Sequence, residues 1–311
     1  METNQLLTLL RRSPAIHCLY AGVFLQEPLP LADDLLITPL QPLGKLAEAD
    51  FLASFSHMIG LPVPASSTHA LAREAKGHRP VVAVSIFVTV PATVEQLEQL
   101  AQPRLGVAEP VLAWASANRP LPLGYVAVLE GHSHLKLAAF GEPVHRIRLG
   151  LSNRGEDFLG QIRALMTASE TDENLAFALS LYRDAIGEQN PEFRIARYFA
   201  CLEALAYRFK AGSVGSRNAV RQLFLPEVSV TDQIEHEGRT YSVDVIEIAG
   251  RLRDKLFHGV PFAEGGLRDD LRWYFTLLKN EPERLASHVA ALCELELSRW
   301  AQGRSKGQAG A

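Results

Sequence analysis

The sequence predicts an α+β protein, in which a strand-rich N-terminal domain is followed by an all-helical C-terminal domain. Up to about residue 168, short apolar or β-branched runs alternate with proline and glycine, which is typical of strands and turns. After residue 172, apolar residues recur at steps of three and four, the period of amphipathic helices. The 311 residues suit two ordinary domains, which we place at residues 1–168 and 169–302, before a frayed tail at residues 303–311.

The N-terminal domain is expected to combine short strands with a few helices. Its clearest strand is Val81–Val90, a β-branched run between Pro80 and Pro91. Glycines separate the later runs, and we expect an antiparallel meander over Leu121–Leu151. The other predicted strands are Val111–Ser116, Leu123–Leu129, Leu135–Phe140 and Val144–Leu149, and the predicted helices are Glu2–Arg12, Leu46–Ile59 and Thr93–Gln102.

The C-terminal domain shows clearer helix boundaries. Asn190 can cap a helix in which Pro191 takes the first position and which Gly212 ends. The polar segment Glu227–Thr240 predicts a loop. We expect a bundle of five or six helices. The others are expected to begin at about Asp172, Ser216, Ser242, Leu267 and Asn280.

Composition excludes several classes of protein. A net charge of −4 argues against a protein held to nucleic acid by bulk positive charge, although it allows a local basic groove. The isolated cysteines Cys18, Cys201 and Cys293 argue against a zinc ribbon or a disulfide framework. The sequence does not start with a signal-peptide pattern, and its longest apolar run falls far below the roughly 20 residues that span a bilayer. We therefore expect a cytoplasmic protein without membrane contact.

We expect no cofactor and no metal. Glu130, His132 and His134 alternate along the chain and could offer metal ligands, but Gly131 and Ser133 favour a turn with surface histidines. The sequence lacks a Walker A loop, a GxGxxG fingerprint, a GxSxG elbow and an HExxH pair. Nucleotide-driven, serine-hydrolase and zinc-protease functions therefore have no support.

The segment most suited to chemistry is Arg251–Gly259, RLRDKLFHG, at the C-terminal end of a predicted helix. Asp254 and His258 are four residues apart and share a face, so the carboxylate could orient the imidazole. An arginine with a histidine suits metal-free phosphodiester cleavage, because histidine transfers protons near neutral pH and arginine binds phosphate with two parallel hydrogen bonds. The structural alternative is that basic residues here cap carbonyls and complement the helix dipole.

The run Arg253-Asp254-x-x-x-His258, followed by glycine, resembles the Arg-x4–6-His signature of the HEPN superfamily. The upstream helix from Pro191 and the run SRNAVR from Ser216 are similar to the ApeA-like HEPN group, and the resemblance covers about Glu173–Trp300. It implies a helical bundle, often dimeric, in which the Arg–His motifs of two subunits face each other. Many members look like metal-independent endoribonucleases of toxin–antitoxin or antiviral systems.

The resemblance also implies roles for the motif residues. His258 would be the acid–base, Arg253 the phosphate ligand and Asp254 a polar support, with RNA cleaved in a homodimer. The N-terminal domain would sense a trigger, choose the target or bind a protein partner. Glu203 lies in an otherwise apolar helix, and we expect it to form a structural ion pair with an arginine such as Arg253. Further RNA contacts are expected from Arg251, Lys255, Arg217 and Arg221.

Three alternatives remain open at this point. The same surface could bind RNA or a partner protein without cleavage. A similar chain layout also occurs in an accessory protein encoded with methylamine-utilisation enzymes. The arginines could instead form a solvated helix face, balanced by Glu188, Glu192 and Glu203. Burial of Arg253 and His258 in contacts within the chain would favour the non-catalytic module.

Overall fold

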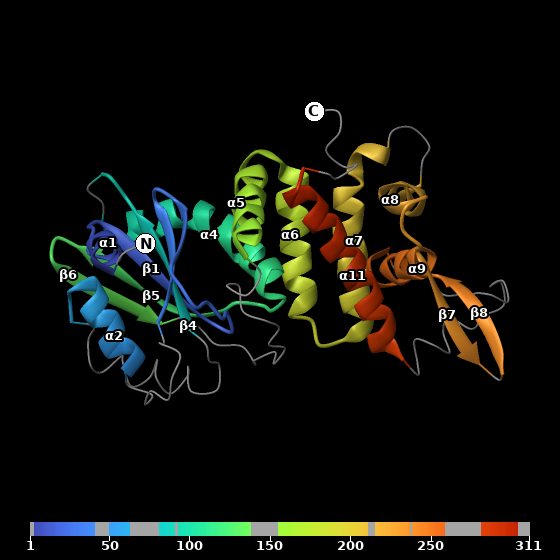
Figure 1. Ribbon diagram of the computed structural model, residues 1–311, viewed down its shortest axis with the longest axis horizontal. Coiled ribbons are helices and arrows are strands. Elements are labelled where there is room, and N and C mark those ends of the chain that lie inside the picture. The colour runs from blue at the N-terminus through green and yellow to red at the C-terminus, as the bar shows by residue number, and fades with distance from the viewer. Residues whose placement is uncertain are drawn as a thin grey trace. The chain divides into compact units, whose positions relative to one another are not determined.

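The computed structural model describes residues 3–40, 50–62, 81–90, 93–137, 155–210, 215–236, 238–258 and 281–303 (Figure 1). The chain divides into two compact units, Met1–Arg163 and Ala164–Ala311, and the division falls within α5 (Gly155–Thr171). The fold is α+β, with an antiparallel sheet in the first unit and a helical region in the second. Within the described part of the chain, no helix combines the length and apolarity needed to cross a membrane.

The first unit contains a six-stranded antiparallel sheet in the order β2-β3-β4-β1-β5-β6. The two central strands, β1 and β4, are buried at all seven of their residues. Because both faces of these strands are covered, their sequences are nearly continuous apolar runs rather than alternating ones. The strands are β1 (Ala15–Ala21), β2 (Leu29–Ala32), β3 (Leu35–Pro39), β4 (Val81–Phe87), β5 (Leu121–Leu129) and β6 (His132–Leu137).

Helices cover both faces of this sheet; they are α1 (Thr3–Leu10), α2 (Asp50–Ile59) and α4 (Val94–Ser116). Successive residues of a strand point to opposite faces. Leu19 of β1 packs in a core cluster with Phe55 of α2. Its neighbour Cys18 lines a cavity of about 320 Å³, together with residues of α4 and Tyr125 of β5. Thus α2 and α4 lie on opposite sides of the sheet.

The predicted strand Val111–Ser116 is wrong, because these residues form the last part of α4. The predicted helix Thr93–Gln102 is the first part of the same helix, which starts with a capping box at Thr93 and continues through Pro103 and Pro110. All six residues of the supposed strand are buried. A helical segment buried on every side shows the same unbroken apolar run as a buried strand, so the pattern did not distinguish them.

The other predictions for this unit differ from the structure mainly in their boundaries. The strand Val81–Val90 ends at Phe87, and the helices Glu2–Arg12 and Leu46–Ile59 correspond to α1 and α2. Strands β1, β2 and β3 were not predicted. The meander is present as the β5–β6 hairpin as far as it is described, and the predicted strand Val144–Leu149 lies outside the described residues.

Helix α7 occupies the centre of the second unit and packs against α6, α9 and α11 (Figure 1). Among the described residues of this unit beyond α5, the α-helices are α6 (Glu173–Ile186), α7 (Pro191–Leu205), α8 (Ser216–Phe224), α9 (Val245–His258) and α11 (Pro282–Ala301), and a short 3-10 helix, η2, covers Tyr207–Lys210. Helix α7 begins as predicted, since the Asn190 side chain accepts hydrogen bonds from the second and third helical N–H groups at 2.9 and 3.3 Å. It ends at Leu205, before the predicted stop at Gly212.

Other helix starts differ slightly from the predicted ones. Gly215 is at the N-cap of α8 and makes no side-chain cap, so Ser216 is already helical. Glu281, rather than Asn280, is at the N-cap of α11. The helix predicted near Leu267 lies outside the described residues.

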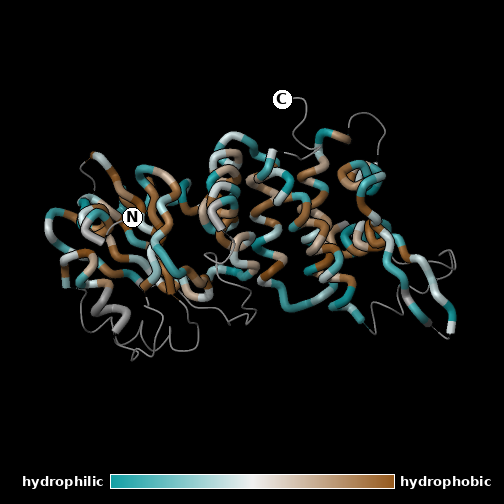
Figure 2. Tube along the Cα trace, in the orientation of Figure 1, coloured by the Kyte–Doolittle hydropathy of each residue, from teal (hydrophilic) through white to brown (hydrophobic). Residues whose placement is uncertain are grey.

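The second unit also contains a β-hairpin, formed by β7 (Thr231–His236) and β8 (Arg239–Asp244). The all-helical prediction and the loop predicted over Glu227–Thr240 are therefore corrected. The hairpin extends away from the helices (Figure 1) and is largely hydrophilic (Figure 2), so its sequence shows little of the apolar alternation that predicts strands. Strand β8 leads directly into α9, where the Asp244 carboxylate accepts a hydrogen bond from the Glu247 N–H at 2.9 Å.

Candidate functional site

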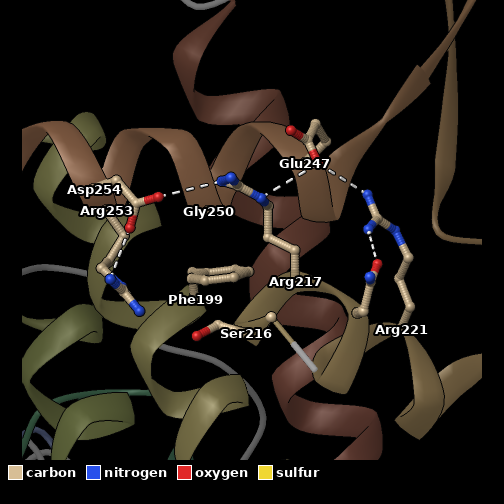
Figure 3. Close-up of a pocket in the computed structure, with 10 residues that line it drawn as sticks. Phe199, Ser216, Arg217, Arg221, Glu247, Gly250, Arg253 and Asp254 are labelled. Atoms are coloured by element: carbon tan, nitrogen blue, oxygen red, sulfur yellow. Dashed lines mark hydrogen bonds and ion pairs between the residues drawn. The ribbon is translucent and has the colours of Figure 1, made fainter. Parts of the chain in front are cut away.

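A polar cavity of about 370 Å³ lies between α8 and α9, with one side chain of α7 in its wall (Figure 3). Three guanidinium groups, two carboxylates and an aromatic ring dominate its lining. We call it the arginine cavity and define it by Phe199, Arg217, Arg221, Glu247, Arg253 and Asp254. Three separate segments of the second unit therefore contribute to one site.

Helical spacing explains why these side chains meet. Glu247, Gly250 and Asp254 are three and four residues apart in α9, so they share one face of that helix. Arg217 and Arg221 are four residues apart in α8 and also share a face. Because α8 packs against α9, the basic face of one helix meets the acidic face of the other.

Gly250 allows the two helices to approach closely. A Cβ atom at this position would lie 2.7 Å from Cγ of Arg217 and 3.0 Å from Cζ of Phe199. Glycine inside a helix is less favourable than alanine by about 1 kcal/mol. Here it makes room for the aliphatic part of Arg217, whose guanidinium then reaches the carboxylates on either side of Gly250.

Each arginine of α8 is bound by two carboxylates, and Glu247 is shared by both arginines (Figure 3). Arg217 donates to Oδ2 of Asp254 at 3.2 Å, and its Nε lies 3.4 Å from Glu247. Arg221 binds Asp244 at 2.7 Å and Glu247 at 3.1 Å. Burial would raise the pKa of Glu247, but the hydrogen bond from Arg221 and the charge of Arg217 lower it below its ordinary value. Glu247 therefore stays charged between the two arginines.

Arg253 is fixed by two carboxylates. Its Nε donates to Glu203 at 2.7 Å, its Nη2 also bonds to Glu203, and its Nη1 donates to Oδ1 of Asp254 at 2.7 Å. The exposed fractions of the Arg253 and Glu203 side chains are only 14% and 9%. Burial would raise the pKa of Glu203, but hydrogen bonds from Arg253 and Ser216 lower it. The ion pair expected between these two side chains is thus present, and it leaves Arg253 already engaged.

The fold brings together some of the residues that the sequence singled out and separates others. Arg217, Arg221, Arg253 and Asp254 all line the arginine cavity. Two further predicted RNA contacts do not line it. Arg251 binds Glu247 one turn earlier in its own helix at 2.9 Å, and Lys255 lies 3.7 Å from Glu192 of α7.

His258 is the last residue of α9, one helical turn after Asp254. Its side chain and the following Gly259 lie outside the described residues. The contact predicted between the Asp254 carboxylate and the imidazole therefore stays a prediction.

Sequence reasoning missed Glu247, Gly250 and Phe199. The signal for the first two was present, because Glu247, Gly250 and Asp254 have helical spacing and a glycine inside a helix often marks close packing.

The described residues contain no group of three histidine, cysteine or acidic side chains that could hold a metal ion. Glu130 lies in the turn between β5 and β6, and His132 and His134 follow it in β6. The three cysteines are free and buried. Burial, helped by the charges of Glu109 and Glu98, raises the pKa of the Cys18 thiol to about 12.

Comparisons with protein-family models, curated proteins and solved structures find no match to this chain.

Proposed function

We propose that the second unit is a HEPN-like endoribonuclease, which works without metal and binds RNA at the arginine cavity. The observation that supports this proposal is the gathering of guanidinium groups beside the Arg253–His258 motif. Arg217 lies 37 residues before Asp254 in the chain, yet the two side chains form a hydrogen bond in the wall of the cavity. Arginines at these positions suit the binding and neutralisation of phosphate oxygens.

The reaction would be a transesterification within the RNA. The 2′-hydroxyl gives its proton to an imidazole, its oxygen forms a bond to phosphorus, and the bond from phosphorus to the 5′-oxygen breaks. The leaving oxygen takes a proton from an imidazolium, so the products are a 2′,3′-cyclic phosphate and a 5′-hydroxyl. His258 would serve these proton transfers, with a second His258 supplied by the other subunit of a homodimer. Arginines of the cavity would stabilise the charge on phosphate.

The proposal extends to the rest of the chain. The first unit would select the target RNA, sense a trigger or bind a protein partner, and the whole chain would act in antiviral or toxin-type defence. We also propose a cytoplasmic location, which suits a protein with three free thiols.

Incubation of purified protein with total RNA in EDTA tests the cleavage. The wild type should produce fragments that end in a 2′,3′-cyclic phosphate, and His258→Ala should be at least about 100-fold slower. His288→Ala is the matched control, because His288 belongs to α11 and does not line the arginine cavity. Equal behaviour of the wild type and His258→Ala would rule out catalysis by this motif.

A second function, RNA binding without cleavage, is favoured by the contacts of Arg253. Its guanidinium is largely buried and already binds Glu203 and Asp254, so phosphate would have to replace a carboxylate. The same incubation, with the RNA that stays bound to the protein measured as well, separates the two functions. RNA that is retained intact, equally by the wild type and His258→Ala, would favour the binding module, whereas no retention and no cleavage would reject both.

A further inference from the structure

The carboxylate of Asp254 lies between two guanidinium groups in the arginine cavity (Figure 3). Its Oδ1 accepts from Nη1 of Arg253 at 2.7 Å, and its Oδ2 accepts from Nη1 of Arg217 at 3.2 Å. Each oxygen of one oxyanion therefore contacts a different arginine. Two oxygens of a phosphate group can be bound in the same way, because charge-assisted hydrogen bonds from guanidinium suit carboxylate and phosphate alike.

Both arginines have other anchors, so their positions do not depend on Asp254. Arg253 is held by Glu203 of α7 through Nε and Nη2. Arg217 is held by its stem, which crosses Gly250, and by Glu247, whose carboxylate lies 3.4 Å from Nε. The two Nη1 atoms that contact Asp254 would consequently stay close together if its carboxylate turned away.

Among the side chains that hold Arg253, the carboxylate of Asp254 is the more exposed one and can turn toward solvent. The exposed fraction of its side chain is 32%, compared with 14% for Arg253 and 9% for Glu203. The Arg217 side chain is equally exposed at 32%, but its stem packs over Gly250 and its Nε lies 3.4 Å from Glu247. A rotation about the side-chain bonds of Asp254 would carry the carboxylate toward solvent, whereas Glu203 is nearly buried and is bound by both Arg253 and Lys210.

We propose that Asp254 is an internal competitor for phosphate: its carboxylate occupies an oxyanion subsite formed by Nη1 of Arg217 and Nη1 of Arg253. A phosphate group enters this subsite when Asp254 turns out. That the phosphate belongs to an RNA backbone rests on the proposed function, but the subsite itself does not. This role predicts the opposite effect to a supporting role of Asp254, because removal of the Asp254 charge should strengthen anion binding.

The test is titration of inorganic phosphate into the full chain at low salt, followed by calorimetry. Asp254→Asn should bind phosphate about tenfold more tightly than the wild type, which corresponds to about 1.4 kcal/mol. Asp244→Asn is the matched control, since it changes the net charge equally but alters a carboxylate that binds Arg221. Its asparagine oxygen can still accept from the Glu247 N–H, so α9 keeps its cap. Phosphate affinity of this control should stay within about twofold of the wild type.

A double variant tests whether Arg217 binds the phosphate. Asp254→Asn combined with Arg217→Met keeps an apolar stem over Gly250 but lacks one guanidinium, and it should lose the whole gain. A ten-nucleotide RNA with 2′-O-methyl groups should rank the variants in the same order, because it lacks the attacking hydroxyl and reports binding alone. Thermal unfolding of each variant shows that it is folded.

The outcomes separate the subsite from the proposed enzyme. If Asp254→Asn binds phosphate no more tightly than Asp244→Asn, or keeps its gain without Arg217, the subsite is rejected. Tighter phosphate binding by Asp254→Asn, in a protein whose wild type never cleaves RNA, would support the subsite and reject the nuclease. Cleavage by the wild type without any gain in Asp254→Asn would do the reverse.

Discussion

His17 in the sheet is buried and Arg253 in the helical unit is largely so, with 14% of its side chain exposed, but one is neutral and the other is charged. His17 is fully buried, its Nδ1 lies 2.8 Å from the Ser85 hydroxyl, and burial lowers its pKa to about 4. It is therefore neutral and surrounded by the rings of Phe55 and Phe87. Arg253 keeps its charge, because Glu203 and Asp254 bind it.

This difference shows which region is suited to an ionic ligand. Among the described residues, His17 contacts the Ser85 hydroxyl and two aromatic rings, so a charge there would lack a carboxylate to compensate it. In the arginine cavity, each guanidinium is bound by carboxylates, and in the proposed subsite an incoming anion takes the place of Asp254. A substitution at the buried histidine or in the arginine cavity should destabilise only the unit that contains it. Hydrogen exchange of peptides from each unit is therefore the most direct measure of that loss of stability.

The largest effect is expected from Glu203→Gln, which removes the buried carboxylate that binds the largely buried Arg253. Loss of one partner from a buried ion pair typically destabilises by about 3–5 kcal/mol, and the remaining contact with Asp254 favours the lower end of that range. Protection of α7 and α9 should fall accordingly, while β1 and β4 should be unaffected. The control is Glu192→Gln, which removes the exposed partner of Lys255 and should change stability by about 0.5 kcal/mol or less. Similar small losses in both variants would show that burial adds nothing to the Arg253 pair.

Acid should destabilise the sheet through His17. At pH values well above 6.5, the ordinary pKa of histidine, the imidazole is neutral in both the folded and the unfolded chain. As the pH falls from about 6.5 toward 4, the unfolded chain takes up a proton that the folded chain excludes, so stability is lost. The loss should reach about 2 kcal/mol at pH 5, measured by exchange of β1 and β4 amides. His17→Asn does not titrate and should lack this pH dependence; an unchanged slope would assign it to other groups.

A smaller effect is expected from Gly250→Ala. The added methyl group meets the stem of Arg217 and should destabilise α9 by about 1 kcal/mol, although alanine favours helices. Gly160→Ala in α5 is the matched control, because its methyl group would have no neighbour within 4 Å. That variant should be stabilised by up to about 1 kcal/mol, as thermal unfolding can show. Stabilisation by both alanines would mean that the two helices tolerate a wider separation.

The predictions from sequence succeeded where one element leaves a local signal. The α+β class, the start of α7 at Asn190 and the strand from Val81 depend on capping residues and short-range periodicity. The predictions for the end of α4 and for the β7–β8 hairpin failed for opposite reasons. The end of α4 is too uniformly buried, and the hairpin is too polar, for the periodicity of apolar residues to show in the sequence.

The site was predictable only in part, because its geometry depends on packing between helices. The motif identified Arg253 and Asp254, and the apolar context of Glu203 identified it as half of an ion pair. Spacing within α9 could not reveal that Arg217 crosses Gly250 to reach Asp254. That contact depends on where α8 lies, which no local pattern records.

The buried cysteines allow the opening of each region to be measured by chemical labelling. A thiol reacts with alkylating reagents as its thiolate, and burial raises the pKa of both Cys18 and Cys293. Cys18 belongs to the sheet, whereas Cys201 and Cys293 belong to α7 and α11. Alkylation at each position is therefore limited by how often the surrounding structure opens. Labelling rates at these native residues can follow the opening of the sheet and of the helices separately, without adding any probe to the chain.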